Sequence, residues 1–346
     1  MKILLDDLPF NDSLFPFGTL KPMVHIRIGI LSIFEKWHMI HPENVFLSSQ
    51  IPLEESEEAL YVKIPGNIIP SANYFKYLNS ENIQLPANND CRILQFPWQI
   101  FEYNKWAIEQ DFEMITSGRE SQEISSSNQL VNAENIFIEE GAIISHCILN
   151  ATDGPIYIGK NAEVQEGCLL RGPLAICEKS RLKMGTKIYG ATTIGPYCMA
   201  GGEIKNSILM NYSNKAHDGY LGDSVIGSWC NLGAGTSNSN LKNTAGTIKM
   251  WSRAGNEFMD AGTKCGLLMG DYSRSAINTS FNTGTIVGIS CNIFGATIPP
   301  KFVDNFTWGN EKYIFEKAIA DINNWKKLKG FAITQEEINS LKKIYS

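Results

Sequence analysis

The feature that most constrains this fold is an aliphatic residue that recurs every six positions. The period runs through seven consecutive hexads without a slip, and a mostly small residue follows each aliphatic position four residues later. The aliphatic positions are Ile158, Val164, Leu170, Ile176, Leu182, Ile188 and Ile194. An α-helix cannot keep a period of six on one face, whereas short strands joined by tight corners can. The pattern predicts a three-sided, left-handed parallel β-helix whose aliphatic residues point inward.

The same register resumes twice further along the chain. The later aliphatic positions are Tyr220, Ile226 and Leu232, and then Met269, Ser275, Phe281, Val287 and Ile293. Fifteen hexads predict about five coils, and a weaker segment with Ile138 and Ile144 would add another. Residues 200–219 and 238–267 do not keep the period. We expect them to leave the β-helix as loops, where binding and catalysis commonly occur.

Half of the eight cysteines fall at the small position of a hexad, namely Cys168, Cys198, Cys230 and Cys291. The chain has no CxxC motif and no Cys/His cluster at metal-ligand spacing. We expect these thiols to be small buried hydrophobic groups without a redox or metal role.

The segments outside the repeat predict a mainly β protein with helical flanks. We divide the chain into a small α/β domain with its linker (1–130), the β-helix (131–300) and a C-terminal helical tail (301–346). Helices are expected over Val24–Trp37, Pro97–Ser117 and Lys312–Lys327, and over a last segment that opens at Thr334 with a capping box and ends near Tyr345. Ser117–Gln129 is predicted to be a polar linker, and Pro299-Pro300 is predicted to end the coils.

Charge and hydropathy exclude several classes of partner. The net charge is −6, which disfavours nucleic acid, and no apolar run approaches the roughly 18 residues of a membrane span. At the N-terminus, Asp6 and Asp7 interrupt the sequence before a signal-peptide core forms, so we expect a cytoplasmic protein without a membrane partner. Residues 131–346 are the less acidic part, and they tolerate an anionic ligand better.

One segment gathers the side chains that catalysis would need. Within 203–240, the residues Glu203, Lys205, His217, Tyr220, Asn231 and Asn240 combine a carboxylate, a cation, an imidazole, a phenol and two amides. Such a set suits an anionic, polyhydroxylated ligand that carries an amine, with lysine for a phosphate and histidine as general base. The alternative is that His217 is a loop histidine packed between subunits, since prisms of this kind commonly form trimers.

This segment resembles the acetyltransferase half of the bifunctional N-acetylglucosamine-1-phosphate uridyltransferase/glucosamine-1-phosphate acetyltransferase family, and most closely its archaeal and Bacteroidetes-type forms. The matching words are GEIKNS at 202–207, HxxYLGDxxIG at 217–227, NxGAGTxxxN at 231–240 and GDYSRSAINTSFNTGTIVG at 270–288. The resemblance covers roughly residues 155–300 well and residues 1–40 loosely.

The resemblance implies an acetyl-CoA-dependent N-acetyltransferase that acts on an amino-sugar phosphate such as glucosamine-1-phosphate, in a homotrimer. His217 would be the general base at a subunit interface, and Glu203 would support its charge state. The substrate would contact Lys205, Tyr220, Asn231 and Asn240. The acetyl-CoA groove would be lined by Ala234, Gly270, Asn278, Thr279 and Gly288.

The sequence departs from the family pattern at the sugar-phosphate site. An arginine expected about eighteen residues before Lys205 is absent; Lys187 stands at that spacing, and Tyr189 takes the place if a gap is introduced. Lys242 and Lys249 are both candidates for a second substrate lysine. A long insertion at 243–263 replaces a short loop.

Residues 1–40 loosely resemble the start of sugar nucleotidyltransferases but lack the glycine-rich loop that binds the nucleotide phosphates. If this reduced domain is active, Lys21 and Arg27 would bind the nucleotide, and Asp6 or Asp7 would hold Mg²⁺. The alternative function is therefore sugar-1-phosphate nucleotidyl transfer, with the β-helix as an oligomerisation scaffold. A third, non-enzymatic alternative is a structural trimer that binds a nucleotide sugar.

Overall fold

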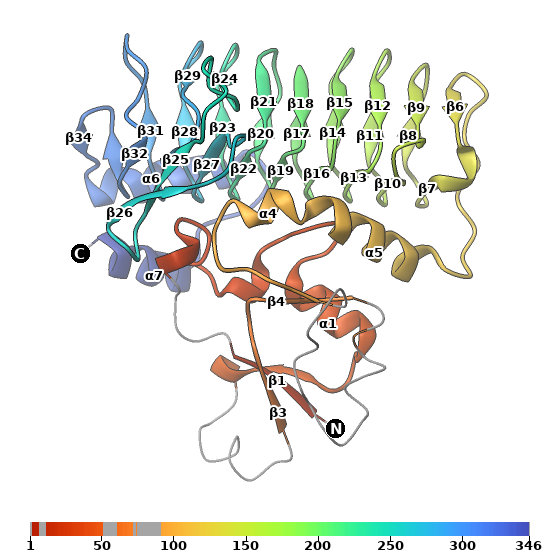
Figure 1. The fold of residues 1–346 in the computed structure, drawn as a ribbon, viewed down its shortest axis with the longest axis horizontal. Helices are drawn as coiled ribbons and strands as arrows, with labels where there is room; N and C mark the ends of the chain where they lie inside the picture. Colours follow the sequence, from red (N-terminus) through yellow and green to blue (C-terminus); the bar gives the residue numbers. More distant parts are fainter. Residues whose placement is uncertain (1, 7–11, 51–60, 72–73, 75–90, 346) are drawn as a thin grey trace.

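Short parallel strands stack in three columns and wind the chain into a three-sided β-helix in this computed structural model (Figure 1). The structure describes residues 2–6, 12–50, 61–71, 74 and 91–345. The arrangement confirms the predicted fold class, and it fits a left-handed β-helix. In the described part of the chain, no helix is both long and apolar enough to cross a bilayer.

Each face of the β-helix is a sheet whose strands come from successive coils. The first face contains β7 (Ile136–Ile138), β10 (Ile156–Ile158), β13 (Leu174–Ile176), β16 (Thr192–Ile194), β19 (Ile208–Leu209), β22 (Val225–Ile226), β27 (Leu267–Met269), β30 (Thr285–Val287) and β32 (Phe302–Val303). The second face contains β8 (Ile143–Ile144), β11 (Glu163–Val164), β14 (Arg181–Leu182), β17 (Met199–Ala200), β20 (Asn214–Lys215), β23 (Asn231–Leu232), β28 (Arg274–Ser275), β31 (Asn292–Ile293), β33 (Thr307–Trp308) and the antiparallel β34 (Glu311–Lys312). The third face contains β6 (Gln129–Val131), β9 (Ile148–Asn150), β12 (Leu169–Arg171), β15 (Lys187–Tyr189), β18 (Glu203–Lys205) and β21 (Tyr220–Gly222), followed by the pair β24 (Ser237–Asn238) and β29 (Ser280–Phe281).

The inward residues of the seven predicted hexads form the core, and each of them is at most 2% exposed. The four cysteines at the small position are also at most 2% exposed, and burial raises the pKa of each thiol. Ser180 and Thr186, at the same position, donate their hydroxyls to the corner carbonyls of Cys177 and Lys183. The small position therefore lets the chain turn without leaving its polar groups unpaired.

The structure has more coils than the sequence predicted, because residues 200–219 do not leave the β-helix. Ala200, Ile204, Leu209, Lys215 and Leu221 all occupy inward positions, at spacings of four, five and six residues. Shortened corners break the hexad there while the strand pairing continues. The predicted inward position of Tyr220 was wrong by one residue, since Leu221 pairs with the inward Ile204.

The prediction that Pro299-Pro300 ends the coils was also wrong. Strand β32 follows these prolines and pairs in parallel with β30, and Val303 points into the core. The prolines lie between strands, where their missing N–H groups interrupt no ladder.

Residues 238–267 do leave the β-helix as predicted. They form a hairpin of β25 (Lys249–Ser252) and β26 (Glu257–Asp260). Its residues Ile248, Met250 and Ala261 are buried in one apolar cluster with the N-terminal part of the chain.

The predicted linker at 117–129 instead covers the first coil of the β-helix. Ser121, Gln122 and Asn128 accept hydrogen bonds through their side chains from the backbone N–H groups of Ile138, Gly141 and Cys147. Ile124 and Leu130 pack against the β-helix core. The polar side chains therefore replace the hydrogen bonds that a preceding coil would make.

The N-terminal part is mixed α/β, as predicted. Strands β1 (Lys2–Asp6), β2 (Val45–Leu47) and β3 (Tyr61–Pro65) form a parallel sheet, and β4 (Ile68–Pro70) pairs with β5 (Cys91–Ile93) in antiparallel fashion. The described helical segments are η1 (Asp12–Leu14), η2 (Met23–His25), α1 (Ile33–Ile40), η3 (Ser48–Gln50), α4 (Gln99–Glu102), α5 (Asn104–Thr116) and, at the first coil, η4 (Ala133–Asn135).

The helix predicted over Val24–Trp37 begins only at Ile33, behind a capping box of Ser32 and Glu35. Gly29 adopts a φ of +77°, and a Cβ atom there would lie 2.4 Å from a carboxylate oxygen of Asp111. Tertiary contacts of residues 26–31 therefore override the local helical pattern.

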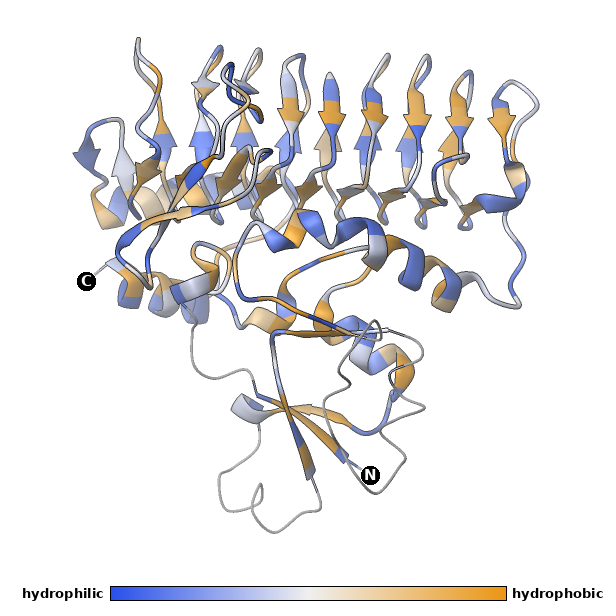
Figure 2. Cartoon of the chain, viewed as in Figure 1, coloured by the Kyte–Doolittle hydropathy of each residue, from blue (hydrophilic) through white to orange (hydrophobic). Residues whose placement is uncertain are grey.

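The N-terminal part covers the first face of the β-helix over most of its length (Figure 1). The outward residues of that face are buried from β7 to β30, and Phe302 on β32 is half-buried. The buried ones are Phe137, Tyr157, Ala175, Thr193, Ile208, Val225, Leu268 and Ile286. Helix α5 runs along the coils, and Figure 2 shows hydrophilic residues along α4 and α5 and hydrophobic ones in the strands. The division of the chain at 130 and 300 stays a prediction.

The C-terminal helices α6 (Phe315–Lys327) and α7 (Gln335–Tyr345) match their predicted positions closely. Thr334 and Glu337 form the predicted capping box. The segment between the helices docks Phe331 edge-on against a stack of Tyr197, Tyr212 and Trp229, which project from one corner of successive coils. Near this stack, Lys329 donates to Asn214 on the second face.

Candidate functional site

The residues predicted to form the site occupy several parts of the β-helix. Lys187, Glu203, Lys205 and Tyr220 lie on the third face. His217, Ala234, Asn278 and Thr279 lie at the corner between the second and third faces. Asn240 lies at the next corner, Asn231 lies on the second face, and Gly270 and Gly288 lie at the corner between the first and second faces. The structure therefore brings the first two groups together, places Asn240 in contact with Tyr220, and separates Asn231, Gly270 and Gly288 from them.

Outward side chains of β15 and β18 form a polar cluster on the third face. Tyr189 pairs in register with Lys205, and Lys187 pairs with Glu203. The Tyr189 hydroxyl donates to a carboxylate oxygen of Glu203 at 2.7 Å, and this bond raises the pKa of Tyr189 to about 12. The Lys205 ammonium lies 5.7 Å from the centroid of the Tyr189 ring. Tyr189 thus stands next to Lys205 on the outward side of the third face.

Tyr220 extends this cluster by one coil. It pairs with Glu203, it is half-buried, and burial raises its pKa to about 12. Its hydroxyl lies over Gly222, where a Cβ atom would be 2.2 Å from the hydroxyl oxygen. Glycine at this position therefore makes room for the phenol.

The side chain of Asn240 is held by a buried carboxylate. Asp223, 4% exposed, accepts hydrogen bonds from the amides of Asn206, at 2.6 Å, and Asn240. Asp223 has a φ of +46°, and it pins the start of the 239–266 excursion to two successive coils. Asp223 belongs to the sequence motif at 217–227, but its partners Asn206 and Asn240 become apparent only in the folded chain.

His217 is exposed on a corner built from stacked turns. Gly235 donates its N–H to Asp218 O at 3.0 Å, and Asn278 donates to Ala234 O at 2.7 Å. These bonds align His217 with Ala234 and Asn278 along one edge of the prism. In the described part of the chain, no hydrogen bond involves the imidazole, which is free to meet a ligand or a second copy.

A buried lysine holds this corner from inside the β-helix. Lys215 is 2% exposed, and its Nζ atom donates to Gly201 O at 3.0 Å and to His217 O at 2.8 Å. Burial lowers the pKa of Lys215 to about 8. Lys215 therefore joins two successive turns beneath the candidate base. Its inward position lies six residues before the inward Leu221, whereas the hexad register predicted Tyr220 as the inward residue.

Three predicted ligand-binding residues lie away from this edge. Asn231 is on the second face between Asn214 and Arg274. Gly270 and Gly288 are buried; Cβ atoms there would lie 2.9 Å from Pro16 and 2.5 Å from Asn305 respectively. These glycines therefore lie at a different corner of the β-helix from Ala234 and Asn278.

The cationic residues of the N-terminal part are engaged with other protein groups. Lys21 forms an ion pair of 2.9 Å with Asp271 of the β-helix. Arg27 is 5% exposed, and its guanidinium contacts Glu35, Ile30 O and Asn211. Asp6 is exposed at the end of β1, and Asp7 lies outside the described residues. No three His, Cys, Asp or Glu side chains of the described residues cluster as metal ligands.

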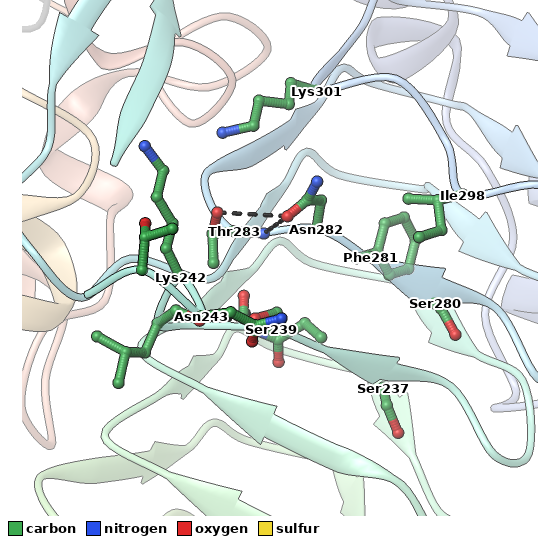
Figure 3. Close-up of a pocket in the computed structure, with 13 residues that line it drawn as sticks. Ser237, Ser239, Lys242, Asn243, Ser280, Phe281, Asn282, Thr283, Ile298 and Lys301 are labelled. Carbon is green, nitrogen blue, oxygen red and sulfur yellow. Dashed lines mark hydrogen bonds between the residues drawn. The ribbon is translucent and has the colours of Figure 1, made fainter. Parts of the chain in front are cut away.

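A cavity of about 660 Å³ lies at the far end of the third face (Figure 3). Its floor is formed by the outward residues of β24 and β29 and the residues that follow them, and its walls come from residues 241–244 and 298–301. The lining includes Lys242 and Lys301. Lys242 is one of the candidate substrate lysines in the sequence, whereas the place of Lys301 follows only from the extra coil after the prolines.

No protein-family model matches the chain. Among curated proteins, it is 29% identical over 223 residues to the bifunctional protein GlmU of Methanocaldococcus jannaschii, which covers 64% of this chain and 48% of that protein. It is 27% identical over 202 residues to a bifunctional sugar-1-phosphate nucleotidylyltransferase/acetyltransferase of Sulfurisphaera tokodaii, with coverage of 58% and 44%. The chain thus spans about half the length of these relatives.

Among solved structures, the chain resembles a UDP-N-acetylglucosamine acyltransferase of Francisella novicida, at 16% identity and a TM-score of 0.28, over 64% of this chain and 76% of that one. The curated matches confirm that the chain has homologues among bifunctional GlmU-type proteins, as the sequence motifs predicted.

Proposed function

We propose that the protein is an acyltransferase that moves the acetyl group of acetyl-CoA to the amine of an amino-sugar phosphate such as glucosamine-1-phosphate. The observation that carries this proposal is the continuity between the His217 corner and the polar cluster of Glu203, Lys205 and Tyr220 on adjacent coils. The similarity to bifunctional proteins whose names include an acetyltransferase supports the reaction class.

In the proposed reaction, the sugar amine attacks the thioester carbonyl, forming the C–N bond and breaking the C–S bond. His217 takes the proton that the amine loses, and the CoA thiolate leaves and is protonated. An imidazole has an ordinary pKa near 6.5, which suits a general base at neutral pH. Lys205 would bind the phosphate, and Tyr220 would donate to a sugar hydroxyl.

A homotrimer would complete the site in this proposal. His217 is exposed, and the N-terminal part already covers the first face, so the third face and the uncovered part of the second remain for other copies. A second copy packed there would supply the opposite wall of the groove along the His217 corner. Asn231, on the second face of one protomer, would then contribute across the interface.

The test is thiol release from acetyl-CoA in the presence of glucosamine-1-phosphate. Substituting His217→Asn should lower kcat by about 10²-fold or more, because the general base is lost. The matched control is His146→Asn, since His146 is an exposed histidine at the same edge of an early coil. Release of thiol at equal rates from the wild type and His217→Asn, or no release with any amino sugar, would refute the proposal.

Nucleotidyl transfer by the N-terminal part is the alternative, with Mg²⁺ as its metal. It predicts pyrophosphate release from UTP and N-acetylglucosamine-1-phosphate. The ion pair of Lys21 with Asp271 and the hydrogen bond that Arg27 donates to Asn211 join these cations to the β-helix, which favours instead an N-terminal part that stabilises it.

A further inference from the structure

We propose that a second cavity, where the N-terminal part, the hairpin, the last coil and α7 meet, binds a small organic carboxylate. The cavity has a volume of about 430 Å³. Its described walls come from the loop 12–20, the tip of the hairpin at Arg253, the last coil at Asn305, and α7. The ligand would be a monoanion with a short apolar chain, and neither acyl transfer nor nucleotidyl transfer uses such a molecule.

The first argument is a buried amide that has an unpaired donor. Asn305 is 5% exposed. Its Oδ1 atom accepts a hydrogen bond from the backbone N–H of Ile289 at 2.8 Å, whereas its Nδ2 atom is buried without a hydrogen-bond partner among the described residues. The amide cannot turn over to pair Nδ2 without losing the bond to Ile289. A ligand oxygen would supply the acceptor that Nδ2 lacks.

Thr19 adds a second unpaired group to the same cavity. Its Oγ1 atom is also buried, and it too lacks a partner among the residues that the structure describes. Thr19 belongs to the N-terminal part and Asn305 to the β-helix, so no single local turn accounts for both groups. Buried hydroxyl and amide groups are nearly always hydrogen-bonded in folded proteins. Two exceptions on one cavity therefore indicate a ligand that accepts hydrogen bonds.

The charge of the cavity favours a monoanion. Arg253 and Lys343 line it with positive charges, and Asp12 is the acidic residue of the described lining. The Arg253 guanidinium lies 3.5 Å from a carboxylate oxygen of Asp304 and 4.0 Å from one of Asp12, whose side chains are 63% and 62% exposed. Water screens such exposed pairs, so Arg253 keeps the capacity to bind a carboxylate. One net positive charge in the lining matches a carboxylate better than a phosphate dianion.

One side of the cavity is apolar. Leu20 and Ile344 line it, and both pack against the apolar cluster that contains Tyr272 and Phe306 of the β-helix. A short alkyl chain on the ligand would extend this cluster. Because each buried methylene group adds to the hydrophobic stabilisation, affinity should rise with the length of the chain.

The cavity lies at a different edge of the prism from the candidate active site. Asn305 lies between β32 and β33, at the corner between the first and second faces, whereas His217 lies at the corner between the second and third. A ligand in the cavity would contact four segments that are far apart in the chain, so it would bind only when all four are docked. Binding should therefore stabilise the folded protein. The inference does not rest on the acyl-transfer reaction.

Binding of acetate, butanoate and hexanoate to the full-length protein tests the proposal without turnover. Calorimetry and the rise in melting temperature measure it, with sodium chloride of equal ionic strength as the baseline. We expect hexanoate to bind more tightly than acetate. Hexanamide, which has the same chain without the charge, should bind at least about tenfold more weakly. Glucosamine-1-phosphate and acetyl-CoA should not compete with hexanoate.

The substitution Asn305→Asp removes the unpaired donor. It keeps the oxygen that accepts from Ile289 and places a negative charge in the cavity, so hexanoate binding should be lost. Arg253→Met should weaken binding about tenfold to a hundredfold, because a charge-assisted hydrogen bond is lost. The matched control is Arg181→Met, which removes an exposed arginine of β14 and its ion pair with Glu163. This control should leave hexanoate affinity unchanged.

Thr19→Val keeps the test decisive if Asn305→Asp does not fold. It removes the unpaired hydroxyl with little change in shape, so the ligand-free variant should melt at or above the wild-type temperature and bind hexanoate roughly threefold to tenfold more weakly. Equal hexanoate affinity in the wild type, Thr19→Val and Arg253→Met would overturn the proposal. So would equal losses in Arg253→Met and Arg181→Met, equal affinity for hexanoate and hexanamide, or no binding of any carboxylate by the wild type.

Discussion

Lys215 is a charged residue in a core made mainly of aliphatic and small side chains. Its ammonium exchanges water for two backbone carbonyls, Gly201 O and His217 O, and burial lowers its pKa to about 8. An ordinary inward residue here would be apolar, as Ala200 and Leu232 are at the same position of the neighbouring coils. The chain thus retains a group that costs stability directly beneath the His217 corner.

We predict that Lys215→Met stabilises the protein and reduces its activity. Methionine fills a similar volume without a buried charge, so the free energy of unfolding at pH 7 should rise by about 1–3 kcal/mol. The corner carbonyls lose their donor, so the acyl-transfer kcat should fall while the His146→Asn control stays at the wild-type value. Chemical denaturation and thiol release measure the two effects, and a less stable variant with full activity would contradict both.

The stability gain should also depend on pH. The folded wild type releases the Lys215 proton near pH 8, whereas the unfolded chain keeps it up to about 10.5. Between these values the unfolded state binds more protons, so wild-type stability rises with pH relative to the variant. The free energy of unfolding of Lys215→Met should exceed that of the wild type by the largest amount below pH 8. This excess should shrink by about 3 kcal/mol as the pH rises toward 10.5. Denaturant midpoints across this range test the trend, which a constant difference would exclude.

At the scale of single elements, helix α5 shows how tertiary contacts decided local structure. Asp111 on α5 pairs with Lys36 on α1, and both side chains are 1% exposed. The same carboxylate accepts from the N–H groups of Ile30 and Leu31 at 2.7 and 3.0 Å. These bonds hold residues 29–31 in a turn, which explains why α1 begins later than its apolar pattern predicted.

We predict that Asp111→Ala destabilises the protein by about 3–5 kcal/mol, because it leaves the Lys36 ammonium buried without its counter-ion. The control on the same helix is Glu109→Ala. In the wild type, a Glu109 carboxylate oxygen lies 3.9 Å from the Lys105 ammonium on the surface. This substitution should change the free energy of unfolding by no more than about 0.5 kcal/mol. Thermal unfolding of both variants measures the difference, and equal melting temperatures would show that the buried pair contributes little.

At the scale of the whole molecule, the N-terminal part determines which faces remain open. Its residues bury the outward side of the first face, and the C-terminal helices lie over the late coils of the second. The third face keeps its outward side chains accessible, among them Ile148 and Leu169, which are 39% and 47% exposed. These residues adjoin the polar cluster of Tyr189 and Glu203.

We predict that the third face contributes to the proposed trimer. Leu169→Glu should shift the mass measured by light scattering from trimer toward monomer and reduce acyl transfer in parallel, since a charge in an apolar contact opposes association. Leu328→Glu, at a 77% exposed position after α6, is the control and should not change the mass. A monomeric wild type with full activity would contradict the predicted assembly.

The β-helix and much of its core follow from the amino-acid sequence alone. The six-residue period of Ile158–Ile194 requires strands with tight corners, and each side chain in it faces inward as predicted. The sequence also located the His217 segment, because its mixture of ionisable and amide groups is unusual for a repeat built from aliphatic and small residues.

The number of coils and the residues that share an edge depend on contacts that form only in the folded chain. Corners can omit a residue without breaking the strand pairing, so Lys215 and Leu221 stay inside although the period fails at 200–219. Likewise, Lys301 meets Lys242 because a loop and a later coil converge on one face, and contacts between residues far apart in the chain leave no periodic trace in the sequence.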